Sequence, residues 1–266
     1  MAYSRSLAPP ANPDLSVVVL CYQAGQHAHA VVEPLYDELE ASGVDYELIL
    51  VANYWPGDKD VTPASVEQLA RGRERVQRIA RPKEGAMGWD MRSGLERGRG
   101  RHLVVIDGDG QVPVQYALEI YQWLTESGAD IVKGRRVSRL DGWLRTVLSA
   151  GYNALFRLMF MTKGVWDING RPKALTRSAY EQLDLRTDDW FTDAEIVLKA
   201  RRYGLTLEEM PVRFLANEER ASFVGPATVW EFLVNMIRWR LGRHPAALAA
   251  RDRAKDPRVA VVKDRR

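Results

Sequence analysis

The chain has very little cysteine and no long hydrophobic run. Cys21 is the single cysteine among 266 residues, and it lies within an apolar segment. A lone cysteine excludes an internal disulfide framework and indicates a reducing compartment. No uninterrupted apolar stretch approaches the roughly 20 residues that span a bilayer, and residues 1–13 lack the apolar core of a secretory signal. We therefore expect a cytoplasmic protein without disulfides or membrane-spanning segments.

A strong net charge is absent from the chain as a whole, but the charge is unevenly distributed. The formal net charge is +3, while residues 238–266 carry ten Lys or Arg against three Asp, which leaves −4 for the preceding 237 residues. A basic segment beside a mildly acidic body suits an anionic surface such as a membrane. A solvated, disordered tail is the alternative. No helix-turn-helix, zinc or RNA-recognition pattern accompanies the basic segment, so we expect no nucleic-acid partner.

The first half of the chain alternates strand-like and helix-like patterns. Short apolar, β-branched runs predict strands, and apolar residues at helical spacing between them predict helices. Strands separated by helices imply a mostly parallel α/β sheet with right-handed crossovers. We expect strands at 15–21, 47–51, 75–80, 103–106 and 130–133, and helices ending near 43, opening at Thr62 as the N-cap, and spanning 87–97 and 113–126.

The second half contains two helical patterns that are apolar on more than one side. They cover residues 140–160 and 229–241, and arginines flank or interrupt both. Such helices lie in a membrane interface or pack against the sheet, and homodimerisation would compete for the same apolar face. We expect a flexible N-terminus at 1–13, one nucleotide-binding domain at 14–223, an amphipathic interface helix at 224–243 and a basic, disordered tail at 244–266.

The most informative segment is the predicted strand Leu103–Ile106 and the residues that follow it. Asp107 and Asp109 alternate with Gly108 and Gly110 directly after this strand. Open α/β sheets bind ligands at the carboxyl ends of their strands. Two carboxylates at such a place suit Mg²⁺ or Mn²⁺, which takes its remaining oxygens from a diphosphate. A solvated turn is the simpler explanation of an Asp-x-Asp pair taken alone.

Five ordered motifs lie between Leu15 and Phe223: 88–95 with Arg92-Ser93-Gly94-Leu95, Asp107 to Gln111, Asp167 to Lys173, Trp190 to Glu195, and Glu209-Met210-Pro211-Val212. In these motifs the chain resembles glycosyltransferase family 2, in its polyprenyl-phosphate (dolichyl-phosphate mannose synthase-like) branch. The resemblance implies a GT-A (Rossmann-like) fold: a mostly parallel sheet flanked by helices, here followed by amphipathic helices. It also implies that a bound metal bridges the diphosphate of a nucleotide-sugar.

The resemblance assigns roles on the donor side of the expected site. Asp107 and Asp109 would contact the metal or the diphosphate, and Gln111 would be a further metal ligand in the mannose synthase branch. Arg92 would pair with phosphate, with a surface arginine as the alternative. Asp90 would approach the base or ribose, or would instead stabilise the amino end of its helix.

Other residues are expected beside the sugar and the acceptor. Lys173 and Arg171 would suit an acceptor phosphate, and Asp167 a hydroxyl of the donor sugar; structural ion pairs are the alternative. Asp193 is the preferred catalytic residue and Glu195 the second. An acid here acts as base in family members with a hydroxyl acceptor, whereas a polyprenyl phosphate is already anionic and needs little help.

The chain departs from the family pattern at three places. The first strand ends Leu20-Cys21-Tyr22-Gln23-Ala24 where the family usually has Pro-x-Tyr-Asn-Glu. The end of the second strand has Ala52-Asn53-Tyr54 where the family usually carries acidic residues. We expect Tyr22 and Asn53 against the nucleotide; Tyr54 or Trp55 could stack on the base, and Asp58 or Asp60 could replace the missing acid. The family's arginine after the Pro-Val strand falls at Asn217, with Arg220 as its replacement.

The resemblance, together with the paired aspartates, implies a metal-dependent glycosyltransferase that inverts the anomeric carbon. It would move a hexose from a GDP-mannose-type or UDP-glucose-type donor to a polyprenyl phosphate at the cytoplasmic face of the membrane, as a peripheral protein. One alternative is a hydroxyl acceptor with Asp193 as base. Another is a catalytically silent protein that binds a nucleotide-sugar or a lipid head group.

Overall fold

The computed structural model describes residues 12–139, 143–162, 164–215 and 226–243. Within these ranges a seven-stranded sheet has the order β3-β2-β1-β4-β6-β5-β7. Its strands are β1 (Leu15–Leu20), β2 (Tyr46–Val51), β3 (Val76–Ile79), β4 (His102–Asp107), β5 (Ile131–Arg139), β6 (Lys173–Thr176) and β7 (Leu207–Phe214). The helices are α1 (His27–Ala41), α2 (Thr62–Ala70), α3 (Met87–Arg97), α4 (Tyr116–Ser127), α5 (Trp143–Phe160), α6 (Arg177–Leu183), α7 (Thr192–Tyr203) and α8 (Pro226–Arg240).

The sheet is mostly parallel, as predicted, with one strand reversed. β1, β2, β3 and β4 pair in parallel, as do β5 and β7, while β6 runs antiparallel to both β4 and β5. The chain reaches β6 from residues 164–172, which lie at the end of the sheet where the parallel strands finish. As a result, the first residues of β6 lie beside the last residues of β4.

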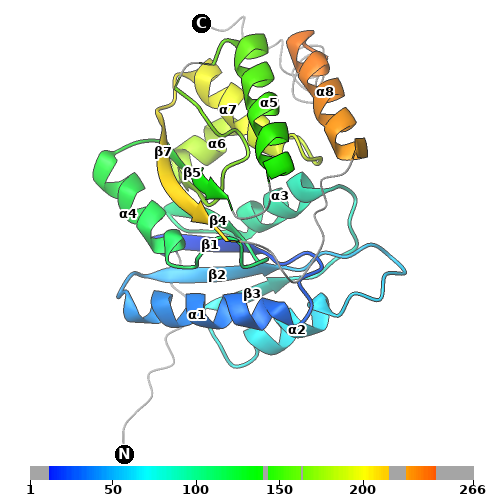
Figure 1. Cartoon of the computed structure of the whole chain (residues 1–266). Helices are drawn as coiled ribbons and strands as arrows, with labels where there is room; N and C mark the ends of the chain where they lie inside the picture. Colours follow the sequence, from blue (N-terminus) through cyan, green and yellow to red (C-terminus); the bar gives the residue numbers. More distant parts are fainter. Residues whose placement is uncertain (1–11, 140–142, 163, 216–225, 244–266) are drawn as a thin grey trace, which may run out of the picture.

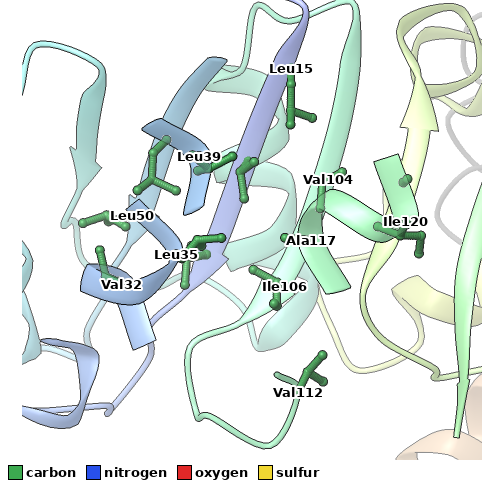
Figure 2. Close-up of a cluster of buried hydrophobic side chains, with 14 of the residues drawn as sticks. Leu15, Val32, Leu35, Leu39, Leu50, Val104, Ile106, Val112, Ala117 and Ile120 are labelled. Carbon is green, nitrogen blue, oxygen red and sulfur yellow. The ribbon is translucent and has the colours of Figure 1, made fainter. Parts of the chain in front are cut away.

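Two hydrophobic clusters cover the two faces of the sheet. Alternating residues of β1, β2 and β4 pack under α1, α2 and α4 on one face, and Figure 2 shows this cluster around Leu35 and Ile106. The intervening residues pack against α3, α6 and α7 on the other face. Figure 1 shows α1 and α2 on the side of the sheet opposite α3. Burial on both faces explains the continuous apolar runs from which the strands were predicted.

A third cluster forms beyond the sheet. Phe156 of α5, Phe191 and Val197 at α7, and Phe232 and Met236 of α8 bury their side chains together. One face of α8 is thus part of the folded domain. None of the helices in the described ranges is both long and apolar enough to cross a membrane.

Two local expectations were wrong in detail. Thr62 is the first residue of α2 and not its N-cap, because Asp60 Oδ1 accepts the Thr62 amide at 2.9 Å and Thr62 Oγ1 accepts the Gly25 amide at 2.7 Å. α4 begins at Tyr116, since residues 113–115 form a turn before it. The sequence reading also missed α6, a short helix capped by Thr176, whose hydroxyl accepts the Ala179 amide.

Candidate active site

Two loops meet where β4 ends and β6 begins. Val105 of β4 pairs with Lys173 of β6, and this antiparallel register, carried two residues further, sets Asp107 opposite Arg171. Arg171 Nε lies 3.6 Å from Asp107 Oδ1. The reversal of β6 therefore brings a cation from the second half of the chain to the predicted metal-binding carboxylate.

Asp193, in the first turn of α7, completes a group of charges that we call the strand-edge cluster: Asp107, Arg171, Lys173 and Asp193. Asp193 Oδ1 lies 3.0 Å from Lys173 Nζ and 3.3 Å from Arg171 Nη2. The Arg171, Lys173 and Asp193 side chains are at most 4% exposed, whereas Asp107 is 29% exposed. The cluster is thus open to solvent only at Asp107.

Burial and ion pairing set the protonation of this cluster. Burial raises the pKa of Asp193, but Arg171 and Lys173 outweigh it and hold the pKa below its ordinary value. Burial lowers the pKa of Lys173 to about 7, against the opposing effect of Asp193. A carboxylate whose negative charge is stabilised in this way is a weak base.

Asp167 is held by a bidentate ion pair. Arg136 Nε and Nη2 donate to its two carboxylate oxygens at 2.7 and 2.6 Å, and the Arg136 amide donates at 3.1 Å. Burial raises the pKa of Asp167, yet Arg136 outweighs it and brings the pKa to about 2. This geometry fixes the loop before β6, and the predicted contact between Asp167 and the donor sugar stays a prediction.

A buried Lys-Glu ion pair also holds the loop before β6. Lys133 of β5 donates to the Asp167 carbonyl and lies 3.1 Å from Glu209 Oε1 of β7. Glu209 in turn accepts the amides of Trp166 and Asp167 at 3.0 Å. The loop that carries Arg171 is therefore anchored to two neighbouring strands.

The expected nucleotide-contacting residues gather at the ends of β1 and β2. Asn53 Nδ2 donates to Asp90 Oδ1 at 2.9 Å, and Lys83 forms a buried ion pair with the same carboxylate. Lys83 Nζ also lies 4.0 Å from the centre of the Tyr22 ring. Burial raises the pKa of Asp90, and Lys83 and Asn53 only partly offset it. The structure brings Tyr22, Asn53 and Asp90 together and adds Lys83.

Two predicted site residues have their contacts elsewhere. Arg92 pairs with Asp188 and Glu96, and so ties α3 to the loop before α7. Glu195 is fully buried, accepts the amides of residues 186 and 187, and lies 2.7 Å from Lys199. These contacts hold the loop that precedes Asp193, and the predicted roles of Arg92 toward a phosphate and of Glu195 in catalysis stay predictions.

Gln111 and Arg220 complete the predicted set. The Gln111 amide donates to Asp109 Oδ1 at 3.1 Å, which shapes the turn, and its side-chain amide donates to the Leu215 carbonyl at 3.4 Å. Leu215 also donates its own amide to the Gln111 carbonyl at 2.8 Å. Gln111 thus connects the turn to the end of β7, and its role as a metal ligand stays a prediction. Arg220 lies outside the described residues.

Sequence reasoning missed Lys83, Lys133, Arg136 and His27. The ring of His27, at the start of α1, lies against the aspartate turn: a Cβ on Gly110 would fall 2.9 Å from His27 Nε2. That nitrogen is buried and finds no hydrogen-bond partner among the described residues. Lys133 and Arg136 act through partners that are 76 and 31 residues away in the sequence, so no local motif marks them.

The chemistry of the donor set fits a divalent cation. In the described ranges no three His, Cys, Asp or Glu side chains converge as a complete metal site. Asp107 and Asp109 offer two hard oxygen ligands at a partly open strand end. Mg²⁺ and Mn²⁺ accept one or two carboxylates when substrate phosphates and water supply the rest. Asp107 and Asp109 are therefore the residues that would hold such an ion.

A mostly parallel seven-stranded sheet of this order, with one reversed strand and helices on both faces, is the GT-A fold. The chain belongs to glycosyl transferase family 2, whose family model matches residues 16–183. The family predicted from the sequence motifs is thus confirmed, and the chain is a glycosyltransferase.

Curated relatives lie at about one quarter identity. Glycosyltransferase AglD of Haloferax volcanii is 26% identical over 219 residues, which cover 77% of this chain but only 34% of AglD. The dolichyl-phosphate beta-glucosyltransferase ALG5A of Trichomonas vaginalis is 24% identical over 92% of this chain and 78% of its own. The dolichyl-phosphate beta-glucosyltransferase of Drosophila melanogaster is 25% identical over 79% and 69%.

Solved structures share the fold. Glucosyl-3-phosphoglycerate synthase from Mycobacterium tuberculosis, in complex with Mn²⁺, UDP and phosphoglyceric acid, has a TM-score of 0.64 at 19% identity, covering 86% of this chain and 79% of its own. The mannosyltransferase PcManGT from Pyrobaculum calidifontis, in complex with GDP-Man and Mn²⁺, has a TM-score of 0.53 at 16% identity, covering 99% and 82%.

Proposed function

We propose that this glycosyltransferase moves a hexose from a nucleoside-diphosphate sugar to a polyprenyl phosphate, with inversion at the anomeric carbon. One observation carries the proposal: Asp193, the carboxylate predicted to be catalytic, is buried between Arg171 and Lys173. The reaction would take place at an anionic, cytoplasmic membrane surface, where such an acceptor resides.

The strand-edge cluster favours an anionic acceptor over a hydroxyl. A hydroxyl nucleophile must lose its proton, which requires a general base of suitable pKa. Arg171 and Lys173 hold the pKa of Asp193 below its ordinary value, so it would remove that proton poorly. A phosphate monoester is already ionised near neutral pH and would be attracted by Arg171 and by the protonated form of Lys173. The same two side chains that weaken the base thus suit the phosphate.

The donor would lie across the ends of β1, β2 and β4. Tyr22, Asn53, Lys83 and Asp90 would contact the nucleoside. Asp107 and Asp109 would hold Mg²⁺ or Mn²⁺, which would stabilise the charge that develops on the departing diphosphate. An acceptor phosphate oxygen would form the new bond to the anomeric carbon as the bond to the diphosphate breaks. The two dolichyl-phosphate glucosyltransferases among the relatives support a UDP-glucose-type donor ahead of GDP-mannose.

The direct test compares two acceptors that differ only in the phosphate. The protein is incubated with labelled UDP-glucose or GDP-mannose, Mn²⁺, and either a short-chain prenyl phosphate or the matching prenyl alcohol. We expect transfer to the phosphate alone. Transfer to the alcohol, abolished in Asp193→Asn while donor binding persists, would instead establish the hydroxyl acceptor with Asp193 as base.

Donor binding is tested separately by calorimetry. We expect one nucleotide-sugar to bind in the presence of Mn²⁺, and Asp109→Ala to weaken this binding at least about tenfold, since it removes a charged metal ligand. Ser127→Ala, at the end of α4, is the control and leaves binding unchanged. Donor binding without transfer to any acceptor would favour a silent binding protein over an enzyme of this specificity.

A further inference from the structure

Exposed apolar side chains are concentrated on one part of the molecule. Of the fifteen large hydrophobic residues that are exposed in the described ranges, nine belong to α5, to α8 or to the residues just after either helix. We call these nine the helical surface: Val147, Leu155, Leu158, Met161, Trp166, Val229, Trp230, Ile237 and Leu241. Figure 1 shows α5 and α8 next to each other at one end of the molecule.

α8 is apolar on two opposite faces. Phe232 and Met236 are buried in the third hydrophobic cluster. Trp230, Ile237 and Leu241, spaced by seven and four residues, form a stripe on the other side, and they are 68, 52 and 60% exposed. Packing within the chain explains only the first face.

α5 repeats this arrangement. Phe156 is buried against α7 and α8, while Val147, Leu155 and Leu158 lie on the outer side, with Leu158 78% exposed. The helix contains no Asp or Glu. The Tyr152 and Phe232 rings, 5.0 Å apart, hold the two helices side by side with their outer faces away from the shared cluster.

Arginines border the apolar side chains. Arg238 and Arg240 are exposed and lie on the two sides of the α8 stripe at helical spacing. Arg201 donates to the Met161 carbonyl, and the Arg157 guanidinium lies 4.9 Å from the Trp166 ring centre. Apolar and aromatic side chains flanked by arginines are typical of surfaces that insert shallowly into anionic lipid.

The helical surface is connected to the acceptor side of the active site. On α5, Asn153 Oδ1 accepts the Ile168 amide at 3.0 Å, in the loop that leads to Arg171. On α8, Asn235 Nδ2 donates to Asp189 Oδ2 at 2.7 Å, in the loop that leads to Asp193. Each helix thus supports one of the two loops that build the strand-edge cluster.

We propose that the helical surface docks on an anionic lipid bilayer and so presents the strand-edge cluster to a phosphate at the membrane surface. Its exposed side chains enter the interface while the flanking arginines contact lipid phosphates. The second half of this statement rests on the proposed function. The first half, that the protein binds anionic lipid through α5 and α8, does not depend on it.

The test uses two matched substitutions in the full-length chain. Ile237 in α8 and Val61 before α2 are both 52% exposed, so Ile237→Glu and Val61→Glu add the same charge to equally exposed aliphatic positions. We expect sedimentation with phosphatidylcholine vesicles that contain phosphatidylglycerol to weaken at least about tenfold in Ile237→Glu, and to be unchanged in Val61→Glu. Both variants are first shown to melt as the wild type does.

Three results would overturn the inference. Equal vesicle binding by both variants would exclude the helical surface as the lipid-binding site. Wild-type binding that is the same with and without phosphatidylglycerol would exclude anionic lipid as its partner. Light scattering that finds a dimer in the wild type and a monomer in Ile237→Glu would make the surface a dimer interface. Transfer to a short-chain, water-soluble prenyl phosphate is measured in parallel: its absence would contradict the proposed function alone, whereas vesicle binding tests only the docking surface.

Discussion

The pKa of a single residue in this site depends on the charge beside it, and Asp167 is the clearest case. Arg136 outweighs the effect of burial and holds the pKa of Asp167 at about 2, below the ordinary value of about 3.9. The pair therefore stabilises the fold fully above the ordinary pKa, and this stability is lost as the pH falls through the folded-state pKa. We expect Arg136→Ala to lower the free energy of unfolding by about 3 kcal/mol at neutral pH, because a buried carboxylate loses its partner.

The pH dependence of this loss identifies its cause. Without Arg136, burial is opposed less and the pKa of Asp167 rises, so the variant regains stability as acid neutralises the carboxylate. Urea unfolding should show the deficit shrinking between pH 7 and about pH 4. Arg101→Ala removes an exposed partner of Asp14 and should cost less than about 1 kcal/mol. A deficit for Arg136→Ala that does not change with pH would show that lost packing, and not charge, is responsible.

The site residues that could be predicted from sequence are those whose position follows from local pattern. Asp107 and Asp109 directly follow an apolar strand, so their place at the sheet edge was predictable. Lys133 and Glu209 are 76 residues apart and meet only because β5 pairs with β7. Arg92 and Glu195 were predicted as site residues from the family's motifs, but their contacts with the loop before α7 could not be seen without the fold.

At the scale of elements, the strand and helix order of the first half was predicted closely, because strands buried on both faces give continuous apolar runs. The direction of β6 was not predictable. It has only four residues, and its orientation depends on where the preceding loop lies and not on its own sequence. The mostly parallel sheet was confirmed, while the reversed strand that delivers Arg171 and Lys173 came from the structure.

The close contact between β5 and the loop before β6 gives an element-scale prediction. A Cβ on Gly134 would fall 2.1 Å from the Arg171 carbonyl oxygen, so Gly134→Ala must displace the loop. We expect a loss of about 2 kcal/mol in urea unfolding and a fall in transfer larger than the fall in donor binding, since Arg171 moves. A Cβ on Gly151 in α5 would meet no atom within 4 Å, and Gly151→Ala should be neutral or stabilising by up to about 1 kcal/mol. Equal donor binding and transfer in Gly134→Ala and the wild type would refute the role of this contact.

At the scale of the whole molecule, the excess of basic charge and the exposed apolar stripe of α8 lie in neighbouring parts of the sequence. Residues 238–266 carry +7 and the rest −4, and α8, with its exposed stripe, leads directly into the basic segment. A chain ending at Arg243 loses seven Lys or Arg and three Asp, a net +4. Each basic residue near an anionic membrane contributes about 1 kcal/mol at most to the binding free energy, and salt screens this contribution.

We therefore expect the shortened chain to bind phosphatidylglycerol vesicles more weakly at low salt and to lose less affinity as salt rises. Ile237→Glu should keep the steep salt dependence of the full chain. Sedimentation across a salt series measures both. Identical salt slopes for the full and shortened chains would mean that the arginines bordering the helical surface, and not the basic segment, provide the electrostatic attraction.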